Sequence, residues 1–386
     1  ADAASQGTIR AELLTSRPAL RPGEVLEFVP GVIVTQHSGD GKANQYFLRG
    51  FNLDHGTDFA TSVNGLPVNM PSHGHGQGYS DLNFLLPELV DRIAYRKGPY
   101  FANVGDFASA GSADIVYRTR LDAPQAHLTL GANGFRRGVL AGSTTLSGDR
   151  HLLAALELQR NDGPWTVPER LHKTNGVLTL SGGTAAEGWQ ASAMHYVARW
   201  TATDQIPQRL VDAGSFQGQP FVRFDSLDPT TGGDTRRSSL SARWQRQDGQ
   251  GTTRLTAYLI DYRLDLFSNF TYALDRPLPA STQGDQFAQH DARRVAGLSA
   301  SRTLDHSLGG LPARSEVGLQ LRHDRVQLRL DDTVARVATD TVRADRVRQT
   351  QLGLFGQTTV ELAPWLRAVA GLRADGARFQ VDSLLL

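Results

Sequence analysis

The sequence predicts two structural units in one chain: a mixed α+β domain up to about residue 122, followed by an antiparallel β-barrel. Three observations predict this arrangement. The residue pattern changes near Pro124, apolar and polar residues then alternate with a period of two, and the connections between these segments alternate between short and long. Apolar runs fall far short of the about 18 to 20 residues that a membrane helix needs, so any membrane association has to come from strands.

The first unit contains short apolar runs separated by Gly, Pro and Asn turns. A helix is expected over residues 21–31, where Arg21-Pro22 begins it and Pro30-Gly31 ends it. A second helix is expected over residues 80–92, because leucines recur there at three- and four-residue spacing, although Pro87 implies a break. Asn64-Gly65 predicts a tight turn between two strands. The unit is therefore expected to mix helices and strands.

After Pro124 the apolar and polar side chains alternate. Leu156 and Leu158 share one face of their segment and Glu157 lies on the other, which is typical of a sheet with one apolar and one polar face. The pattern does not say which face is outside. Eleven candidate strands lie near residues 125–132, 136–147, 150–161, 173–182, 187–200, 236–247, 252–267, 289–304, 314–330, 344–361 and 365–382.

The connections between these strands decide between architectures. Short turns are expected after the second, fourth, sixth and tenth strands and a moderate one after the eighth. Long polar loops are expected after the third, fifth, seventh and ninth, at residues 161–172, 201–235, 268–288 and 331–343. This parity is typical of outer-membrane barrels, which have tight turns at one end and long loops at the other. A soluble sandwich has no reason to keep it.

The odd number of predicted strands leads to a further expectation about the barrel. Single-chain bacterial barrels close with an even number of strands, so eleven strands predict about half of a transmembrane barrel of about 22. Residues 123–386 are then the N-terminal part of that barrel, truncated at the C-terminus, and the sequence is a fragment with an open sheet edge.

Composition excludes several function classes. The chain has 40 Lys+Arg against 39 Asp+Glu, so nucleic acid is not an expected partner. It has no Cys, which excludes disulfides, thiolate metal sites and a Cys nucleophile. It also lacks a GxSxG elbow, an HExxH motif and a P-loop, so an enzyme is not expected.

Five motifs in the first unit resemble, in order and spacing, the plug domain of TonB-dependent outer-membrane receptors. They are RPGEVLEFVPGVIVTQ (21–36), QYFLRGF (45–51), SVNGLPV (62–68), LPELVDRIAYRKGP (86–99) and SAGSADIVYRTR (109–120). The resemblance covers about the first 120 residues motif by motif, which gives a plug domain at 1–122. The second unit matches only in pattern. The family's usual Leu-Tyr-Gly and glycine pair are replaced by YFANVGDFASAGSADIVYR, so the ligand class does not carry over.

The resemblance implies a receptor in the outer membrane of a Gram-negative bacterium, surrounded by outer-membrane lipid. Such a receptor captures a scarce nutrient, most often a siderophore or another metal chelate, and imports it. Its partner is TonB, the inner-membrane energy-transducing complex, acting on a segment expected upstream of residue 1. No cofactor is firmly implied, and an iron chelate or another transition metal would be cargo. A passive porin or adhesin-like barrel is the alternative, although an open channel has no use for a plug.

Two arginines in the plug motifs are candidate anchors. Arg49 in LRG and Arg96 in YRKGP are expected to bond carboxylates of the plug or the barrel wall, because arginine pairs bidentately with carboxylates. The resemblance implies that similar arginines hold the plug inside a polar lumen. Direct contact with the ligand is the alternative role.

The most distinctive chemical feature is NMPSHGHGQGYSD at residues 69–81, which the resemblance places among the plug's apical loops. His73 and His75 are separated by one glycine and can present two imidazoles on one side of an extended loop, a good arrangement for zinc, copper, nickel or iron. Zinc needs three or four ligands, so Asp54, His55, Asp58 or His37 would have to complete a site. The candidate ligand-binding residues are His73, His75, Gln77, Tyr79, Asp54 and His55, with His73 and His75 as metal ligands.

Three interpretations of this segment stay open. The glycines permit close packing against the barrel wall while the imidazoles bond to neighbouring groups. Alternatively, the histidines contact an organic ligand or chelate directly, or they coordinate a bare metal ion.

Overall fold

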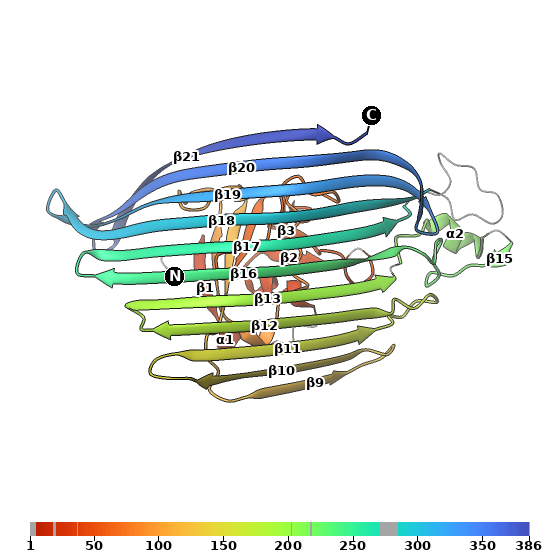
Figure 1. The fold of residues 1–386 in the computed structure, drawn as a ribbon, viewed down its shortest axis with the longest axis horizontal. Helices are drawn as coiled ribbons and strands as arrows, with labels where there is room; N and C mark the ends of the chain where they lie inside the picture. Colours follow the sequence, from red (N-terminus) through yellow and green to blue (C-terminus); the bar gives the residue numbers. More distant parts are fainter. Residues whose placement is uncertain are drawn as a thin grey trace.

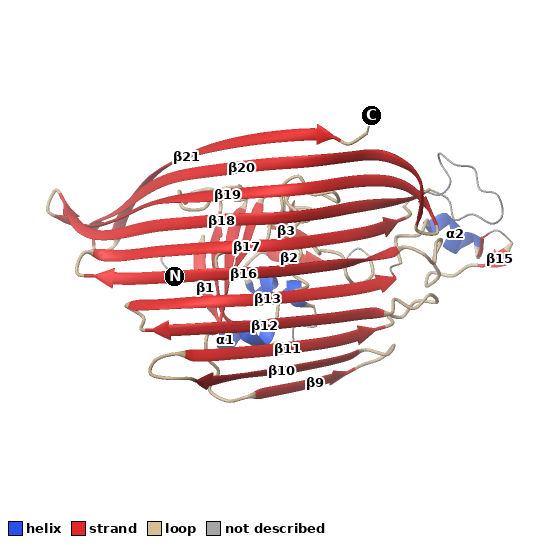
Figure 2. Cartoon of the chain, viewed as in Figure 1, coloured by secondary structure: helices blue, strands red, loops and turns tan. Residues whose placement is uncertain are grey.

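The computed structural model describes residues 5–17, 21–36, 38–201, 203–216, 218–270 and 285–385. An 11-stranded antiparallel sheet forms its larger part, and an N-terminal domain with a 5-stranded and a 3-stranded sheet lies against that sheet (Figure 1). Strands dominate both parts, and helices are confined to short segments (Figure 2). Within the described ranges, no helix is long and apolar enough to cross a membrane.

Two small sheets build the N-terminal domain. The larger has the order β1-β7-β8-β5-β6, in which β5 and β8 run parallel and the other neighbours antiparallel. Its core of leucines and isoleucines is fully buried. The strand bounds are β1 (Gln6–Arg10), β2 (Val32–Thr35), β3 (Gln45–Leu48), β4 (Phe51–Asn52), β5 (Phe59–Val63), β6 (Leu66–Pro67), β7 (Val90–Lys97) and β8 (Gly111–Tyr117). The helical segments are α1 (Ala11–Leu14) and the 3-10 helices η1 (Pro22–Phe28) and η2 (Pro87–Leu89).

The first helix prediction is confirmed and the second is wrong. In η1, Pro22 occupies the first turn, where its missing N–H costs nothing. Over residues 80–92 only η2 is helical, and the chain continues directly into β7. Pro87 holds Leu86 in an extended conformation, with φ −104° and ψ 98°. The leucines of this stretch are buried by the surrounding domain rather than along one helix face.

The predicted tight turn at Asn64-Gly65 is confirmed. Both residues have positive φ, 53° and 75°, and they join β5 to β6 as a two-residue hairpin turn. Asparagine and glycine are the residues that tolerate this conformation best.

All eleven predicted strands of the second unit are present and neighbour one another in chain order from β9 to β21. Their bounds are β9 (Gln125–Leu130), β10 (Arg136–Thr145), β11 (His151–Asn161), β12 (Leu171–Gly183), β13 (Glu187–Thr201), β16 (Gly232–Asp248), β17 (Gly251–Ser268), β18 (Gln286–Leu308), β19 (Leu311–Val334), β20 (Val337–Ala363) and β21 (Leu366–Ser383). Between β13 and β16 lie α2 (Gln208–Ala213), β14 (Ser215–Phe216) and β15 (Gln219–Pro220). The predicted domain boundary at 122 falls between β8 and β9, and remains a prediction.

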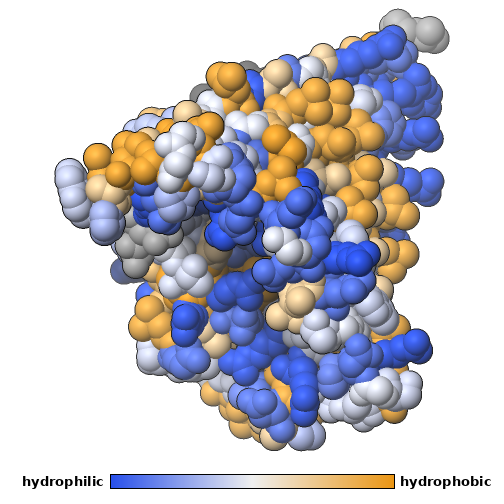
Figure 3. Space-filling model, turned by 90° about the vertical axis from the view of Figure 1, so that its left-hand side faces the viewer, coloured by the Kyte–Doolittle hydropathy of each residue, from blue (hydrophilic) through white to orange (hydrophobic). Residues whose placement is uncertain are grey.

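The sheet has one apolar and one polar face, and the apolar face points away from the N-terminal domain. On β11, Leu156 and Leu158 are exposed, whereas Glu157 between them is fully buried on the inner side. At the end with the short turns, hydrophilic residues dominate the middle of the molecule and hydrophobic ones gather toward its margin (Figure 3). The open question about which face is outside is therefore answered.

The predicted short turns are confirmed, and one predicted long loop is wrong. Residues 331–343 were expected to form a polar loop, but β19 and β20 continue through them and are joined only by Ala335-Arg336, with φ 51° and 68°. Polar composition suggested a loop, whereas the two strands stay paired through this stretch, with register shifts between Leu330 and Asp331 and between Asp332 and Thr333. The eighth connection is also shorter than expected, at Gly309-Gly310. Among the described residues, β9 and β21 each pair on one side only, so the expected open edges are present.

Candidate functional site

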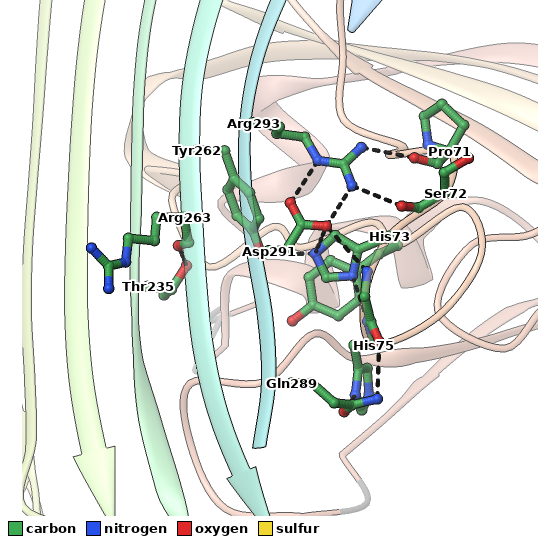
Figure 4. A network of polar contacts seen from close by, with 12 residues as sticks. Pro71, Ser72, His73, His75, Thr235, Tyr262, Arg263, Gln289, Asp291 and Arg293 are labelled. Atoms are coloured by element: carbon green, nitrogen blue, oxygen red, sulfur yellow. Dashed lines mark hydrogen bonds and ion pairs between the residues drawn. The ribbon is translucent and has the colours of Figure 1, made fainter. Parts of the chain in front are cut away.

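Two loops of the N-terminal domain meet near the sheet end that carries the long connections. One is the loop of residues 53–58 between β4 and β5, and the other is the histidine-rich segment 69–81. Residues from the start of β18, just after the 269–285 connection, contact the second loop (Figure 4). We refer to these two loops as the apical loops.

Tyr79 supports the histidines of both apical loops. It is 1% exposed, and its hydroxyl accepts the backbone N–H of Ala43 at 3.1 Å. The His73 ring stacks on it at 4.1 Å between centroids with 2° between planes, and the rings of His55 and His75 lie 5.7 and 5.6 Å away. The position of Tyr79 is that of a buried support for the imidazoles.

His73 is enclosed between Tyr79 and the wall of the large sheet, and its side chain is fully buried. Its Nδ1 accepts the backbone N–H of His75 at 3.1 Å, so the neutral ring carries its proton on Nε2. Nε2 lies 3.2 Å from the Tyr262 hydroxyl. Burial lowers the pKa of His73 to about 3, even though the Asp291 carboxylate favours the charged form. His73 is therefore neutral at physiological pH, with both nitrogens engaged.

We refer to Tyr262, Asp291 and Arg293 as the wall cluster. Its charged members, Asp291 and Arg293, form hydrogen bonds with the backbone of the histidine-rich segment (Figure 4). Arg293 donates to the carbonyl oxygens of Pro71 at 2.8 Å and Ser72 at 3.2 Å, and to both oxygens of Asp291. Asp291 accepts the backbone N–H of Gly74 at 3.1 Å. The loop is therefore held by its main chain.

Gly74 packs closely against the wall of the large sheet. A Cβ at this position would lie 3.1 Å from the carbonyl oxygen of His290 on β18, tighter than ordinary contact. This is the arrangement expected if the glycines serve packing, and it applies to the His73-Gly74 part of the segment.

His75 and His55 face each other from the two apical loops. Their Nε2 atoms are 3.3 Å apart, and their ring centroids are 4.9 Å apart. Nδ1 of His75 lies 2.8 Å from Oε1 of Gln289, and Nδ1 of His55 lies 3.1 Å from the carbonyl oxygen of Asn44. Burial lowers the pKa of His55, which favours its neutral, ligating form.

The other predicted residues differ in their surroundings. The Asp54 carboxylate is half-exposed, with Oδ1 3.8 Å from Nε2 of His55. Gln77 is exposed, and its Oε1 accepts the backbone N–H of Ser72 at 2.8 Å. Asp58 accepts the hydroxyls of Thr57 and Ser109. His37 lies outside the described residues.

The described residues of the apical loops do not form a complete coordination site for a metal ion. Within the part of the chain that the structure describes, no group of three or more His, Cys, Asp or Glu side chains could hold one. The ligand-binding and metal-binding roles assigned from the sequence therefore remain predictions.

The two predicted anchoring arginines lie in different settings. Arg49 is exposed at the turn between β3 and β4, with φ 55°, and no carboxylate among the described residues pairs with it. Arg96 donates to Asn103 at 2.5 Å, which in turn donates to Glu316 on β19 at 3.0 Å. Arg96 thus reaches the sheet through one intermediate, and the anchoring role of both remains a prediction.

Several arginines of the large sheet bond directly to the N-terminal domain. Arg137 on β10 binds both oxygens of Glu88, at 2.5 and 3.0 Å, and Arg322 on β19 donates to the carbonyl of Asn69 at 2.9 Å. Sequence reasoning missed these residues. For Arg322 the signal was an Asp two positions away, Asp324, which a strand places on the same face. Arg137 has no such neighbour in the sequence.

A folded domain bonded to the polar face of a large antiparallel sheet, whose other face is apolar, is the arrangement expected of a plugged β-barrel. Comparison with protein families supports this class. The model described as TonB-dependent Receptor Plug Domain matches residues 2–112, and the model described as TonB dependent receptor-like, beta-barrel matches residues 178–385. The chain belongs to the TonB-dependent receptor family. Members of this family are outer-membrane receptors and transporters of Gram-negative bacteria, not enzymes.

Solved structures share the fold. The ferric citrate transporter FecA in its unliganded form matches with a TM-score of 0.80 at 14% identity, over 98% of this chain and 57% of that one. The closed form of the ferric-catecholate import receptor Fiu from E. coli K12 matches with a TM-score of 0.75 at 14% identity, over 99% and 57%. The copper transporter OprC matches with a TM-score of 0.71 at 18% identity, over 98% and 59%. The chain thus spans less than two thirds of their length.

Proposed function

We propose that this chain is the plug and part of the barrel of an outer-membrane receptor that captures a scarce metal, as a siderophore or another chelate, and imports it with energy from the TonB system. Residues 1–122 are the plug in this proposal, and residues 123–386 belong to the barrel. The apical loops, including Asp54, His55, His73, His75, Gln77 and Tyr79, form or support the surface that meets the ligand.

The observation that carries the proposal is the set of buried polar bonds between the plug and the sheet. Lys42 pairs at 2.8 Å with Asp204, in the connection between β13 and β16, and both side chains are almost fully buried. Arg137 joins Glu88 to Glu157, whose other oxygen is 3.0 Å from Lys173. Breaking a buried pair costs about 3 to 5 kcal/mol because a charge is left uncompensated. A plug held in this way supports transport driven by an external energy source rather than free diffusion.

The nature of the cargo is supported by the structural neighbours and by the apical loops. The names of the neighbours refer to ferric citrate, ferric catecholates and copper. The histidine-rich loop offers imidazole nitrogen, a ligand of transition metals. The exposed leucines on the outer face of the sheet fit contact with outer-membrane lipid.

A passive porin or adhesin-like barrel is the second candidate, and the bonded plug speaks against it. The two are separated by removing residues 1–122 from the full-length receptor and measuring cellular uptake of ferric citrate, ferric catecholates and Cu²⁺, with and without the proton gradient. The proposal predicts saturable, gradient-dependent uptake of at least one cargo by the intact receptor, and gradient-independent leakage without the plug. Tight, energy-dependent uptake by the plugless form would overturn the proposal.

A further inference from the structure

The two apical loops bring one pair of imidazole nitrogens face to face. His55 comes from the loop before β5 and His75 from the histidine-rich segment, and their Nε2 atoms are 3.3 Å apart. A hydrogen bond between nitrogen and its acceptor is most often about 2.9 to 3.0 Å long. The separation of this pair is longer but within hydrogen-bond reach, so the nature of the contact depends on which nitrogens of the two rings carry the protons.

The proton positions on both rings follow from their other contacts. Nδ1 of His55 faces the carbonyl oxygen of Asn44, which can only accept a hydrogen bond. Nδ1 of His75 faces Oε1 of Gln289, and the amide nitrogen of Gln289 donates to the carbonyl of Gly74 at 3.0 Å, which fixes the orientation of that amide. Each neutral ring therefore carries its proton on Nδ1. The basic atom of each ring is Nε2, and these two atoms face each other.

A metal ion suits two basic nitrogens at this separation. A tetrahedral ion with metal–nitrogen bonds of about 2.0 to 2.1 Å places its ligand nitrogens about 3.3 to 3.4 Å apart. Metal-binding histidines commonly donate their second N–H to a carbonyl or carboxylate, which fixes the ring and increases its basicity. His55 and His75 both have this second contact. His73 does not qualify, because its Nδ1 already accepts the backbone N–H of His75.

We propose that His55 and His75 together bind a divalent transition-metal ion of the Zn²⁺ or Cu²⁺ class as cargo, either alone or in a chelate with open coordination positions. This inference rests on the proposed import function and specifies its substrate class. Imidazole nitrogen suits such borderline ions, whereas a chelate that fully encloses its metal leaves no position for it. The Asp54 carboxylate, with Oδ1 3.8 Å from Nε2 of His55, adds negative charge beside the pair.

Two protein ligands fit a receptor that has to release its cargo. Structural zinc sites are closed by four protein ligands, and catalytic ones use three. Within the described ranges no group of three or more His, Cys, Asp or Glu side chains could hold an ion. The cargo's own ligands or water can occupy further coordination positions. His73 then acts as a positioning residue, since it holds the backbone of His75.

Metal titration of the purified full-length receptor tests the proposal. After chelator treatment, ZnCl₂ and CuCl₂ are titrated by calorimetry into the wild type, His55→Gln, His75→Gln and the control His306→Gln, whose exposed ring lies near the short-turn end of β18 and bonds Ser315. The wild type and the control bind one equivalent. Either variant of the pair loses affinity by at least about tenfold. Equal binding by the wild type and the His55→Gln/His75→Gln double variant overturns the proposal.

A second measurement needs no substitution and is unaffected by misfolded variants. Electron paramagnetic resonance of the wild type with one equivalent of Cu²⁺ is expected to show coupling to two imidazole nitrogens, and a spectrum without nitrogen coupling contradicts the proposal. Failure of the proposed metal-binding pair can be distinguished from failure of the proposed import function. Energy-dependent uptake without histidine-dependent binding refutes only the metal pair, whereas histidine-dependent binding without energy-dependent uptake refutes only the import function.

Discussion

His73 and His75 are separated by one glycine in the chain, yet they occupy two different regions of the plug–sheet boundary. His73 belongs to a closed region, where Tyr79 stacks on its ring, the Tyr262 hydroxyl lies beside Nε2, and Nδ1 accepts the backbone N–H of His75. His75 belongs to a more open region, where it meets His55 and where Asp54 is half-exposed. The comparison shows that a shared motif does not give its residues one role. Burial and the partner of each ring nitrogen decide between support and ligand binding.

The largest effect on this contrast is expected from Arg293→Ala. The Arg293 side chain is fully buried and Asp291 nearly so, and removing the arginine leaves a buried carboxylate uncompensated and frees the loop backbone. We expect a loss of about 3 to 5 kcal/mol in the free energy of unfolding, measured by denaturant titration in detergent. Arg294→Ala is the matched control, because the side chain of Arg294 is 84% exposed. Equal stability of the two variants would show that the closed region is not held by the wall cluster.

The second-largest effect is expected in the pH dependence of folding stability. Burial lowers the pKa of folded His73 to about 3, below the value of about 6.5 in an unfolded chain. Between these values the unfolded state binds the extra proton, so the contribution of His73 to stability is complete above about pH 6.5 and is lost as the pH falls. Asp291 faces this ring and raises the pKa of His73, which opposes the effect of burial. The charges of Arg293, His75 and His55 lower this pKa further.

This pH effect is measured as a difference between wild type and His73→Gln, so that other titrating groups cancel. Relative to the variant, the wild type should lose on the order of 2 kcal/mol between pH 6.5 and 4.5. Burial raises the pKa of Asp81 to about 6, so the contribution of Asp81 to stability changes with pH in the opposite direction. This contribution is the same in the wild type and the variant and cancels in the difference. A pH-independent difference would mean that His73 is not enclosed in its neutral form.

The third effect is a difference in stability between alanine substitutions at Gly74 and Gly76, two glycines of the histidine-rich segment. A Cβ on Gly74 would lie 3.1 Å from the His290 carbonyl, whereas a Cβ on Gly76 would meet its nearest neighbour, His55, at 3.8 Å. Gly74→Ala is therefore expected to destabilise the receptor by about 1 to 2 kcal/mol, and Gly76→Ala by much less, in thermal unfolding. A Gly76→Ala variant as unstable as Gly74→Ala would show that both halves of the loop are equally enclosed.

The smallest effect is expected from Asp54→Asn. This carboxylate is 52% exposed and 3.8 Å from His55, so its contribution to metal binding is below about 1 kcal/mol and is screened by salt. Calorimetry with Zn²⁺ should give less than about a tenfold loss of affinity at low salt and no difference at high salt. A larger loss that persists at high salt would make Asp54 a direct ligand.

Much of the fold could be predicted from the sequence because alternation with a period of two is a local signal. All eleven strands of the large sheet were found in this way, whereas the stretch 331–343 was assigned to a loop because it is polar. The helix expected over 80–92 failed because its leucines are buried on every side by tertiary contacts. The outer face of the sheet could be settled only by the position of the plug.

The candidate site was predictable only in part. The histidine-rich segment and His55 stand out in the sequence, but the difference between His73 and His75 depends on Gln289 and Asp291, more than 200 residues away. Only the docking of the plug against β18 brings these residues together. The arginines of the sheet were missed for the same reason, although Arg293, Arg322 and Arg329 each lie two residues from an aspartate in the sequence.

The claim that the bonded plug closes the lumen is tested most directly by conductance across a planar bilayer. Ala102→Cys with Gly371→Cys places a candidate disulfide between plug and sheet, where a Cβ on Gly371 would lie 3.0 Å from that of Ala102, and any cysteine elsewhere in the full-length receptor is replaced by serine. The full-length receptor should be electrically silent, open in urea when the pair is reduced, and stay silent in urea when it is oxidised. A wild-type receptor that conducts without urea as strongly as the form lacking residues 1–122 would contradict the account.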